Sequence, residues 1–354
     1  LETPLLRAED AWRRFSASPL AQVAARLQRE VLVQSVYGTN TIEGAELTEE
    51  ETSQALDLDP AAVQAEQEVR VRNIRSAYDL ATQAGTDPAW TLTLSFVQAV
   101  HAEICRDLET EDNRAGRFRD NPKTRPTVVG SAEHGGVCRP PQYGRDIQRL
   151  MEALVDWHAA LQSAGLPPLV RAPLVHLYFE WIHPFWDGNG RVGRVLEAAL
   201  LRHAGLEYAP FAMAKYYQEH IHRYFALFNQ CRKLAAAGDA QAHMPFIALH
   251  LEGLRVVCDR LHDRVNAMVG VLLHEASLRQ KLEQKTINAR QYALIRLVTD
   301  HGAPMPTRVL KADPRFRALY WRLTDRTANR DLNELQYHHL LLQDADGNWV
   351  PGFR

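Results

Sequence analysis

Twelve consecutive residues, 183–194, concentrate side chains that suit phosphate transfer, and they read HPFWDGNGRVGR. Asp187 is a hard oxygen ligand, the type that Mg²⁺ accepts together with phosphate oxygens. His183 belongs to the residue type that is mostly neutral at pH 7, as a general base must be. Arg191 and Arg194 supply guanidinium groups, which bind phosphate oxygens well. The segment therefore predicts a nucleotide, Mg²⁺ and a base that activates an incoming hydroxyl.

The elements on either side of this segment are expected to be helices. LVRAPLVHLYFEWIHPF at 169–185 predicts a buried helix, and VGRVLEAALLRHAG at 192–205 predicts a second one. The first amides of a helix lack partners within the helix, and the helix dipole makes that end electropositive. Gly188 and Gly190 let the backbone approach an anion closely. The turn between the helices is therefore expected to bind phosphate.

Each of these features has a simpler explanation when it is taken alone. A histidine at a helix end is more often structural, a G-x-G pair is a weak signal, and arginines on a helix are usually solvated. One loop nevertheless carries every group that phosphate transfer requires. The segment is neither a Walker loop nor part of a kinase signature set.

The segment HPFWDGNGRVGR resembles the pattern H-x-F-x-[DE]-G-N-G-R-x-x-R of the Fic-domain family at every fixed position. The resemblance covers roughly residues 30–250, and further similar stretches lie at 67–81, 116–119, 127–141 and 216–232. It implies a mainly α fold, in which a helical core carries a small β-hairpin flap. It also implies an enzyme that transfers AMP from ATP to a hydroxyl of a target protein and releases pyrophosphate.

The same resemblance implies a role for individual residues. His183 would deprotonate the target Ser, Thr or Tyr, and Asp187 would hold Mg²⁺ on the α- and β-phosphates. Phe185 would anchor the loop in the core. The other residues implied at the nucleotide are Gly188, Asn189 and Gly190 in the anion hole, Arg191 and Arg194 on the phosphates, Val129, Gly130 and Ser131 on the flap, and Tyr224 beside the nucleoside. The flap would also clamp the target by strand pairing. Gly188 favours AMP transfer over the kinase-like branch of the family, which replaces this glycine.

A second stretch, TNTIEG at 39–44, precedes the expected core. Alone, it reads as a helix that ends at Gly44. Beside the Fic resemblance, it is similar to the family's inhibitory motif [ST]-x-x-x-E-[GN]. Glu43 would then pair with Arg194, which otherwise receives the γ-phosphate, and the resting enzyme would have low activity.

Composition and charge set the limits of the whole chain. The 354 residues are 46% hydrophobic and 24% charged, with a net charge of −2, which indicates a globular protein that does not bind polyanions over its whole surface. The sequence contains no run of about 18 apolar residues, so it predicts no membrane-spanning helix. The four cysteines show no metal-binding spacing, and we expect buried free thiols in a cytoplasmic protein. We expect an N-terminal helical region with the inhibitory helix at 1–95, a catalytic core at 96–250, a linker helix at 251–284 and a further domain at 285–354.

The last of these domains is basic. From residue 285 onward there are eleven Lys or Arg and seven Asp or Glu. The expected order is a helix, a short helix, a basic connector DPRFRALYWR, a third helix and a hairpin with DADG at its turn, which resembles a winged helix-turn-helix. In the third helix an apolar stripe leaves Arg326, Asn329, Arg330 and Asn333 on the opposite face, and such side chains read base edges in DNA. A protein partner for this face remains an alternative.

Three functions therefore remain open. The first is protein AMP transfer, with self-modification expected. The second is a DNA-binding regulator whose Fic core only senses nucleotide. The third is a hydrolase that removes AMP from modified proteins, with Glu43 orienting a water. The sequence does not identify the target protein, and a homodimer that hides the site is one arrangement that it allows.

Overall fold

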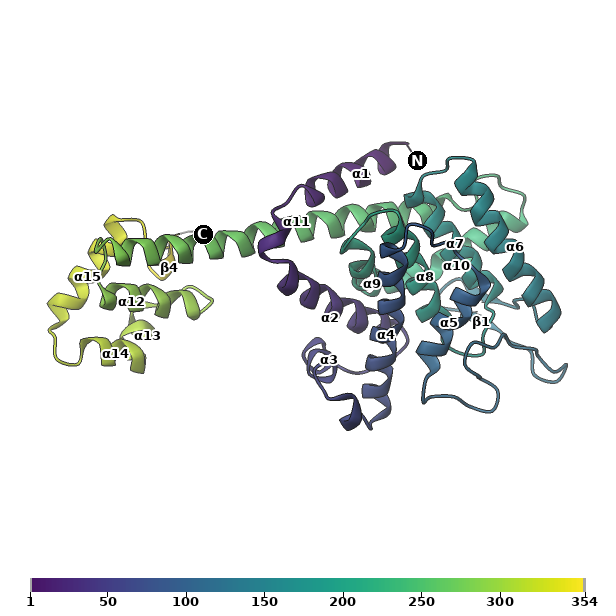
Figure 1. Cartoon of the computed structure of the whole chain (residues 1–354), viewed down its shortest axis with the longest axis horizontal. Helices are drawn as coiled ribbons and strands as arrows, with labels where there is room; N and C mark the ends of the chain where they lie inside the picture. Colours follow the sequence, from purple (N-terminus) through teal and green to yellow (C-terminus); the bar gives the residue numbers. More distant parts are fainter. Residues whose placement is uncertain (1, 353–354) are drawn as a thin grey trace. The chain divides into compact units, whose positions relative to one another are not determined.

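The computed structural model describes residues 2–352, which form two compact units (Figure 1). The first unit ends at Asp263, and the second begins at Arg264. Helices make up most of both units, and the described residues contain two short antiparallel hairpins. The expectation of a mainly α fold is thereby confirmed. Within residues 2–352, no helix is both long enough and apolar enough to cross a membrane.

Ten α-helices, two 3₁₀ turns and one hairpin precede the long helix α11. Their bounds are α1 Glu2–Ser16, η1 Leu20–Gln22, α2 Ala24–Ile42, α3 Glu49–Leu56, η2 Pro60–Ala62, α4 Glu66–Thr86, α5 Leu94–Cys105, β1 Val129–Ser131, β2 Gly136–Cys138, α6 Gly144–Ser163, α7 Pro168–Ile182, α8 Asn189–His203, α9 Ala209–Glu219 and α10 Ile221–Ala236. The remaining elements are α11 Met244–Glu283, α12 Ala289–Asp300, α13 Thr307–Ala312, α14 Pro314–Tyr320, α15 Asp325–Tyr337, β3 Leu341–Gln343 and β4 Trp349–Pro351.

Helix α8 is the centre of the first unit, and α4, α5 and α7 pack against it (Figure 1). Twelve of its fifteen residues are buried, so it has no solvated face. A helix in this position can keep arginines only if other buried groups pair with them. The N-terminus of α8, which follows the loop at 183–188, therefore lies in the interior of the unit.

Local sequence signals account for several of the helix starts. The Thr48 hydroxyl accepts a hydrogen bond from the Glu51 amide at 3.2 Å, and the Glu51 carboxylate accepts one from the Thr48 amide at 2.8 Å. This capping box satisfies donors that the first turn of α3 would otherwise leave unpaired. Asn288 and Gln291 form the same arrangement at the start of α12.

Three stretches differ from what their sequences predict. Residues 314–320 form helix α14 instead of a basic connector, because Asp313 caps the Arg315 amide at 2.7 Å and Pro314 suits the first helical position. Phe316 and Tyr320, four residues apart, are both buried by the helix. The apolar spacing in residues 61–85 favours one continuous helix, but the stretch begins as the turn η2, and α4 starts only at Glu66.

The stretch 216–232, which resembles a single helix of the Fic family, is divided between α9 and α10. The break is at His220, whose φ of −118° and ψ of 31° lie outside helical values. Its ring nitrogen Nδ1 lies 2.9 Å from the Tyr216 carbonyl oxygen, so the side chain satisfies part of the interrupted helix end.

The second unit has its own hydrophobic core, to which α12, α14, α15 and the hairpin β3–β4 all contribute. The hairpin closes through residues 344–347, the expected DADG turn. A buried carboxylate, Asp331, accepts hydrogen bonds from Arg290 Nε at 2.6 Å and from the Tyr320 hydroxyl at 2.9 Å. All four cysteines of the chain are free thiols.

Candidate functional site

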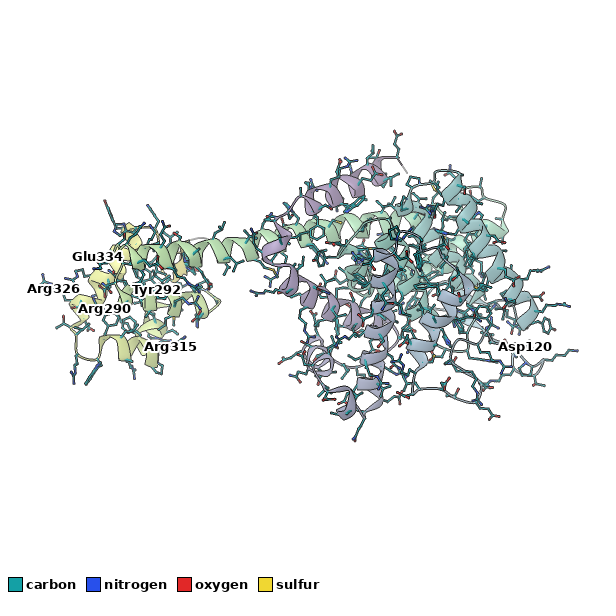
Figure 2. The ribbon with its side chains drawn as sticks, in the orientation of Figure 1. Asp120, Arg290, Tyr292, Arg315, Arg326 and Glu334 are labelled. Atoms are coloured by element: carbon teal, nitrogen blue, oxygen red, sulfur yellow. The ribbon has the colours of Figure 1, made fainter. Side chains whose placement is uncertain are left out.

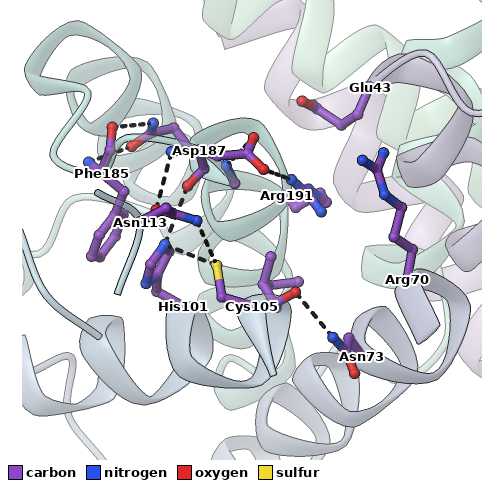
Figure 3. Close-up of polar contacts among 12 residues, drawn as sticks. Glu43, Arg70, Asn73, His101, Cys105, Asn113, Phe185, Asp187 and Arg191 are labelled. Carbon is purple, nitrogen blue, oxygen red and sulfur yellow. Dashed lines mark hydrogen bonds and ion pairs between the residues drawn. The ribbon is translucent and has the colours of Figure 1, made fainter. Parts of the chain in front are cut away.

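The loop between α7 and α8 is held by its own residues. His183 ends α7 in the left-handed region at φ 50°, and Gly188 begins α8 at φ 82°. The Asn189 side chain accepts from the Phe185 amide and donates to the Phe185 carbonyl, both at 2.9 Å. Phe185 is fully buried and stacks on the His101 ring at 3.7 Å between centroids (Figure 3). The Asn189 side chain thus fixes the shape of the loop.

His101, which the sequence analysis missed, supports the loop from α5. The Gly116 amide donates to its Nδ1 at 2.9 Å, so the proton lies on Nε2, which faces the Asp187 carbonyl at 3.2 Å. Burial lowers the pKa of His101 to about 4, and the ring is therefore neutral at pH 7. Asn113 accepts a hydrogen bond from the Asp187 amide at 3.3 Å on the same side of the loop (Figure 3).

Arg119 holds the other end of the loop, and the sequence analysis did not identify it as a site residue either. Its side chain is almost completely buried, and Nε donates to the His183 carbonyl at 2.7 Å. Its backbone amide donates to the Pro184 carbonyl at 2.9 Å, and its Nη2 donates to the Ile182 carbonyl at 3.4 Å. These carbonyls are the unpaired acceptors at the end of α7. Arg119 therefore fixes the backbone that carries His183.

A cavity of about 280 Å³ opens in front of this loop. Eight residues predicted from the sequence line it: Glu43, Val129, Gly130, Ser131, His183, Gly190, Arg194 and Tyr224. They come from α2, the strand β1, the loop, α8 and α10, so the fold gathers them from distant parts of the chain. The other predicted loop residues, Asp187, Gly188, Asn189 and Arg191, are not among the residues that line the cavity.

Arg194 lies at the inner end of the cavity, and the side chain is 2% exposed. Its Nη2 donates to Glu43 Oε1 at 2.6 Å, its Nε to the Thr39 hydroxyl at 3.0 Å and its Nη1 to the Tyr224 hydroxyl at 3.4 Å. Burial works against the charge, but the Glu43 carboxylate, through its charge and its hydrogen bond, more than offsets this effect, so the pKa of Arg194 is raised. The guanidinium is therefore permanently charged.

Gly190 allows the Glu43 carboxylate to reach this place. A Cβ at position 190 would lie 2.3 Å from Glu43 Oε1 and 3.1 Å from Arg194 Nη1. The carboxylate thus rests directly on the first turn of α8, where backbone amides and the helix dipole favour a negative group. In this structure, Glu43 occupies the position that suits an anionic ligand.

Behind Arg194, a buried polar network keeps the arginine in place. The Tyr224 hydroxyl lies 3.0 Å from His176 Nε2, and His176 Nδ1 lies 2.8 Å from Glu197 Oε2. Burial strongly raises the pKa of Tyr224, so it remains a neutral phenol. Burial also disfavours the Glu197 carboxylate, but His250 and His176 outweigh this effect and lower its pKa. Tyr224, predicted beside the nucleoside, thus also positions Arg194.

Asp187 lies at the outer side of the loop, and its side chain is 62% exposed. One carboxylate oxygen accepts from Arg191 Nη2 at 2.9 Å, and the other accepts from the Gly188 amide at 2.6 Å (Figure 3). Partial desolvation of the carboxyl group by its neighbours opposes its ionisation, but the charge and hydrogen bond of Arg191, together with the Gly188 amide, lower the pKa of Asp187 overall. The exposed oxygens of this ionised carboxylate suit a hard cation, which would share Asp187 with Arg191.

Glu180 is another residue of the cavity that the sequence analysis missed. It precedes His183 by three residues on α7, so both side chains lie on one helix face. Glu180 Oε2 is 3.7 Å from His183 Nδ1, and its Oε1 is buried above Gly193, where a Cβ would approach it to 2.6 Å. The i, i+3 spacing of a carboxylate and a histidine was the only available signal for this pair.

In the second unit, helix α15 presents the expected two faces. Ala328, Leu332 and Leu335 are buried in the core. The four polar residues predicted for the opposite face are all exposed: Arg326, Asn329, Arg330 and Asn333. They line a surface groove together with Thr324, Thr327, Glu334 and Tyr337. Arg326 points away from the ribbon in Figure 2.

Comparisons with known proteins point to one family. Residues 91–201 match the model of the Fic/DOC family. The chain is 28% identical over 243 residues to the protein adenylyltransferase Fic of Drosophila grimshawi, covering 67% of this chain and 45% of that protein. It is 26% identical over 232 residues to the protein adenylyltransferase Fic of Nematostella vectensis, covering 63% and 48%. The chain thus spans less than half the length of these curated relatives.

Solved structures show the same fold. A Fic-domain-containing signaling protein from Bacteroides thetaiotaomicron superposes with a TM-score of 0.61 at 20% identity, covering 75% of this chain and 97% of that one. A Fic family protein from Desulfovibrio desulfuricans superposes with a TM-score of 0.57 at 22% identity, covering 99% and 94%. Residues 91–201 of this chain are therefore a Fic domain of the Fic/DOC family.

Proposed function

We propose that this chain is a protein adenylyltransferase, which moves AMP from ATP to a Ser, Thr or Tyr hydroxyl of a target protein and of itself. The observation that carries the proposal is the joint lining of one cavity by His183, Gly190 and Arg194 at the start of a buried helix. The names of the curated relatives support it, since both proteins described above are protein adenylyltransferases.

In this proposal, His183 takes the proton from the attacking hydroxyl of the target. The hydroxyl oxygen forms a bond to the α-phosphorus, and the bond from that phosphorus to the bridging oxygen breaks, so pyrophosphate leaves. The amides at the start of α8 and the Arg194 guanidinium stabilise the negative charge on the phosphates. Arg119 and His101 hold the loop that sets the distance between base and phosphate.

Asp187 is the residue proposed to hold Mg²⁺, which neutralises phosphate charge when bound. The exposed carboxylate fits this role by its oxygen donors, and Arg191 next to it favours the ionised form. Arg191 then has a second partner available in the phosphates.

The hairpin β1–β2 is proposed to present the target segment. Its two strands pair only with each other among the described residues, so the other edge of β1 is available for strand addition. Val129 and Ser131 flank Gly130, where a Cβ would lie 2.6 Å from the Gly136 carbonyl oxygen. Strand addition would place a target hydroxyl beside the cavity that these residues share with His183.

We further propose that Glu43 inhibits the resting enzyme. Its carboxylate pairs with Arg194 at 2.6 Å and rests on the first turn of α8, so it competes with a phosphate for the same donors. A triphosphate cannot bind there productively until the carboxylate leaves, because two negative groups would share one small site.

Label transfer from ATP carrying radioactive α-phosphate, with Mg²⁺, tests the function. The wild type, Glu43→Gly and the double variant Glu43→Gly with His183→Ala are compared. We expect label on protein mainly with Glu43→Gly, at least about tenfold above wild type, which corresponds to about 1.4 kcal/mol. Absence of label in all three would contradict AMP transfer. Release of AMP from an already modified target, dependent on Glu43, would identify the hydrolase instead.

We propose DNA as the partner of the second unit. The support is the exposed groove on α15, with Arg326, Arg330 and two asparagines opposite a buried apolar stripe. Such side chains suit phosphates and base edges. Duplex binding is measured by fluorescence anisotropy at two salt concentrations, and replacing both arginines by alanine is expected to weaken it and to lower the salt dependence. Arg149→Ala, at an exposed arginine of α6, is the control. Equal binding by all variants would place DNA outside this groove, and no binding by any of them would favour a protein partner.

A further inference from the structure

Three side chains that the proposed reaction does not use converge at the tip of the hairpin. Glu133 and His134 belong to the turn between β1 and β2, and His222 lies in the first turn of α10. His222 Nδ1 is 3.3 Å from Glu133 Oε1, and it is 3.2 Å from His134 Nε2. Among the residues that the structure describes, this is the one group of three or more His, Cys, Asp or Glu with ligand atoms within 4.8 Å of one another.

The spacing of these atoms agrees with tetrahedral coordination. Metal–nitrogen and metal–oxygen bonds to Zn²⁺ are about 2.0–2.1 Å long, so neighbouring ligand atoms of a tetrahedral site lie about 3.3 Å apart. The two separations that involve His222 Nδ1 match this edge length, and all three ligand atoms lie within 4.8 Å of one another. Two imidazoles with one carboxylate suit Zn²⁺, Co²⁺ and Ni²⁺, whereas Mg²⁺ prefers an all-oxygen shell.

A neighbouring hydroxyl sets the tautomer that metal binding requires. Ser131 Oγ lies 2.9 Å from His134 Nδ1. When His134 donates its Nδ1 proton to this hydroxyl, the lone pair of Nε2 is free and points toward His222. The ring of His134 also packs against Phe225 at 5.2 Å between centroids, which restricts its orientation.

We propose that Glu133, His134 and His222 bind a divalent transition-metal ion of the zinc type, with water as the fourth ligand. Nε2 of His134, Nδ1 of His222 and a Glu133 oxygen each donate a lone pair, and no bond within the protein is broken. The ion fastens the hairpin turn to α10. This inference does not depend on AMP transfer, since binding is measured without nucleotide.

The ion reinforces contacts that already join the hairpin to α10. Lys233 Nζ donates to the Gly135 carbonyl at 2.6 Å, and the Asn229 amide donates to the Gly136 carbonyl. Ser131 and His134 also line the cavity in which the nucleotide is proposed to bind. A metal at the turn therefore reduces the mobility of one wall of that cavity, and with it the mobility of the edge proposed to receive a target.

Titration of the full chain with Zn²⁺ tests the proposal, with Mg²⁺ in excess so that oxygen-only sites are filled. The variants are His222→Ala and Glu133→Gln, both at exposed positions, and His338→Ala is the control for an exposed histidine outside the cluster. We expect one ion per chain for the wild type and His338→Ala, with affinity at least about tenfold lower for the two cluster variants. Equal stoichiometry and affinity in all four proteins would overturn the site.

Two further readouts separate a specific site from loose surface binding. Co²⁺ in a tetrahedral site gives a strong visible absorption band, which the wild type should show and His222→Ala should lose. Amide hydrogen exchange in residues 131–138 should slow on addition of Zn²⁺ in the wild type and remain unchanged in His222→Ala. A Co²⁺ spectrum typical of octahedral hydrated ions, with no change in exchange, would contradict the proposal.

Discussion

Removing the Glu43 carboxylate should have two effects of opposite sign, one on stability and one on nucleotide binding. The contact to replace is the 2.6 Å hydrogen bond between Glu43 Oε1 and Arg194 Nη2, with side chains 24% and 2% exposed. Hydrogen bonds to charged groups contribute about 1.5–3 kcal/mol to stability. Arg194 keeps its bonds to Thr39 and Tyr224, so it does not become an unpaired buried charge. We therefore expect Glu43→Gly to lower the free energy of unfolding by about 1–3 kcal/mol.

The same substitution frees the donors at the start of α8 for a triphosphate. If the pair contributes about 2–3 kcal/mol against nucleotide, its loss raises the affinity for Mg·ATP by roughly 30- to 150-fold. Urea unfolding without nucleotide measures the first effect, and calorimetry with a non-hydrolysable ATP analogue measures the second. Glu46→Gln, at an exposed glutamate three residues away, is the control and should change neither quantity.

The combination of results decides the question. A variant that is less stable alone but binds nucleotide more tightly supports direct competition between carboxylate and phosphate. Unchanged affinity in Glu43→Gly, despite lower stability, would refute the reasoning, because it would make the ion pair purely structural. Glu43→Gln should have a nucleotide affinity between those of the wild type and Glu43→Gly, since it keeps the shape of the side chain and removes its charge.

Three other predictions concern the loop. Arg119→Met should lower the free energy of unfolding by about 2–4 kcal/mol and reduce the transfer rate, because the carbonyl of His183 loses its donor. Urea unfolding and label transfer check this, and an unchanged transfer rate would contradict a positioning role for Arg119. Burial lowers the pKa of His101 to about 4 in the folded state, below an unfolded value of about 6.5. The stability contributed by this residue should therefore be complete above pH 6.5 and fall by up to about 3 kcal/mol as the pH drops toward 4. Unfolding measured at several pH values checks this, and a flat profile would contradict it. Gly188→Ala should destabilise the protein by about 1–2 kcal/mol and weaken nucleotide binding, because φ at this position is 82° and the added Cβ would lie 3.1 Å from the Ile104 side chain. Equal melting temperatures for the wild type and the variant would exclude this strain.

Helix periodicity and end signals were sufficient to predict most of the elements near the site. The loop between α7 and α8 and the glycine at its end agree with their sequence patterns, and the hairpin at 129–138 agrees with the flap that the family resemblance implies. Helix α14 was missed because its seven residues are too few for a periodic pattern, and tertiary burial of Phe316 and Tyr320 stabilises it. The break at His220 was missed for a related reason, since no glycine or proline marks it.

Long-range partners in the site could not be derived from spacing. Glu43 and Arg194 are 151 residues apart, and only the family resemblance relates them. Arg119 lies in the stretch 116–119 that resembles the family, but the sequence assigns no role to it or to His101, because they bind backbone carbonyls and an aromatic ring that only the folded chain brings near. A buried arginine and a buried neutral histidine are recognisable by burial, which the sequence alone does not report.

The close packing of α2 determines how the cavity can be opened. At Gly38, a Cβ would lie 2.7 Å from the Lys215 backbone nitrogen, so α2 is seated tightly on α9 and cannot easily move as a whole. Glu43, in contrast, is the residue after the last turn of α2, where only its own side chain must rotate. Basal activity is then set by the fraction of molecules in which this one side chain has swung away, and a free-energy difference of about 2.7 kcal/mol leaves roughly one molecule in a hundred active. A partner that held Glu43 aside could raise the rate by up to about a hundredfold without moving any helix.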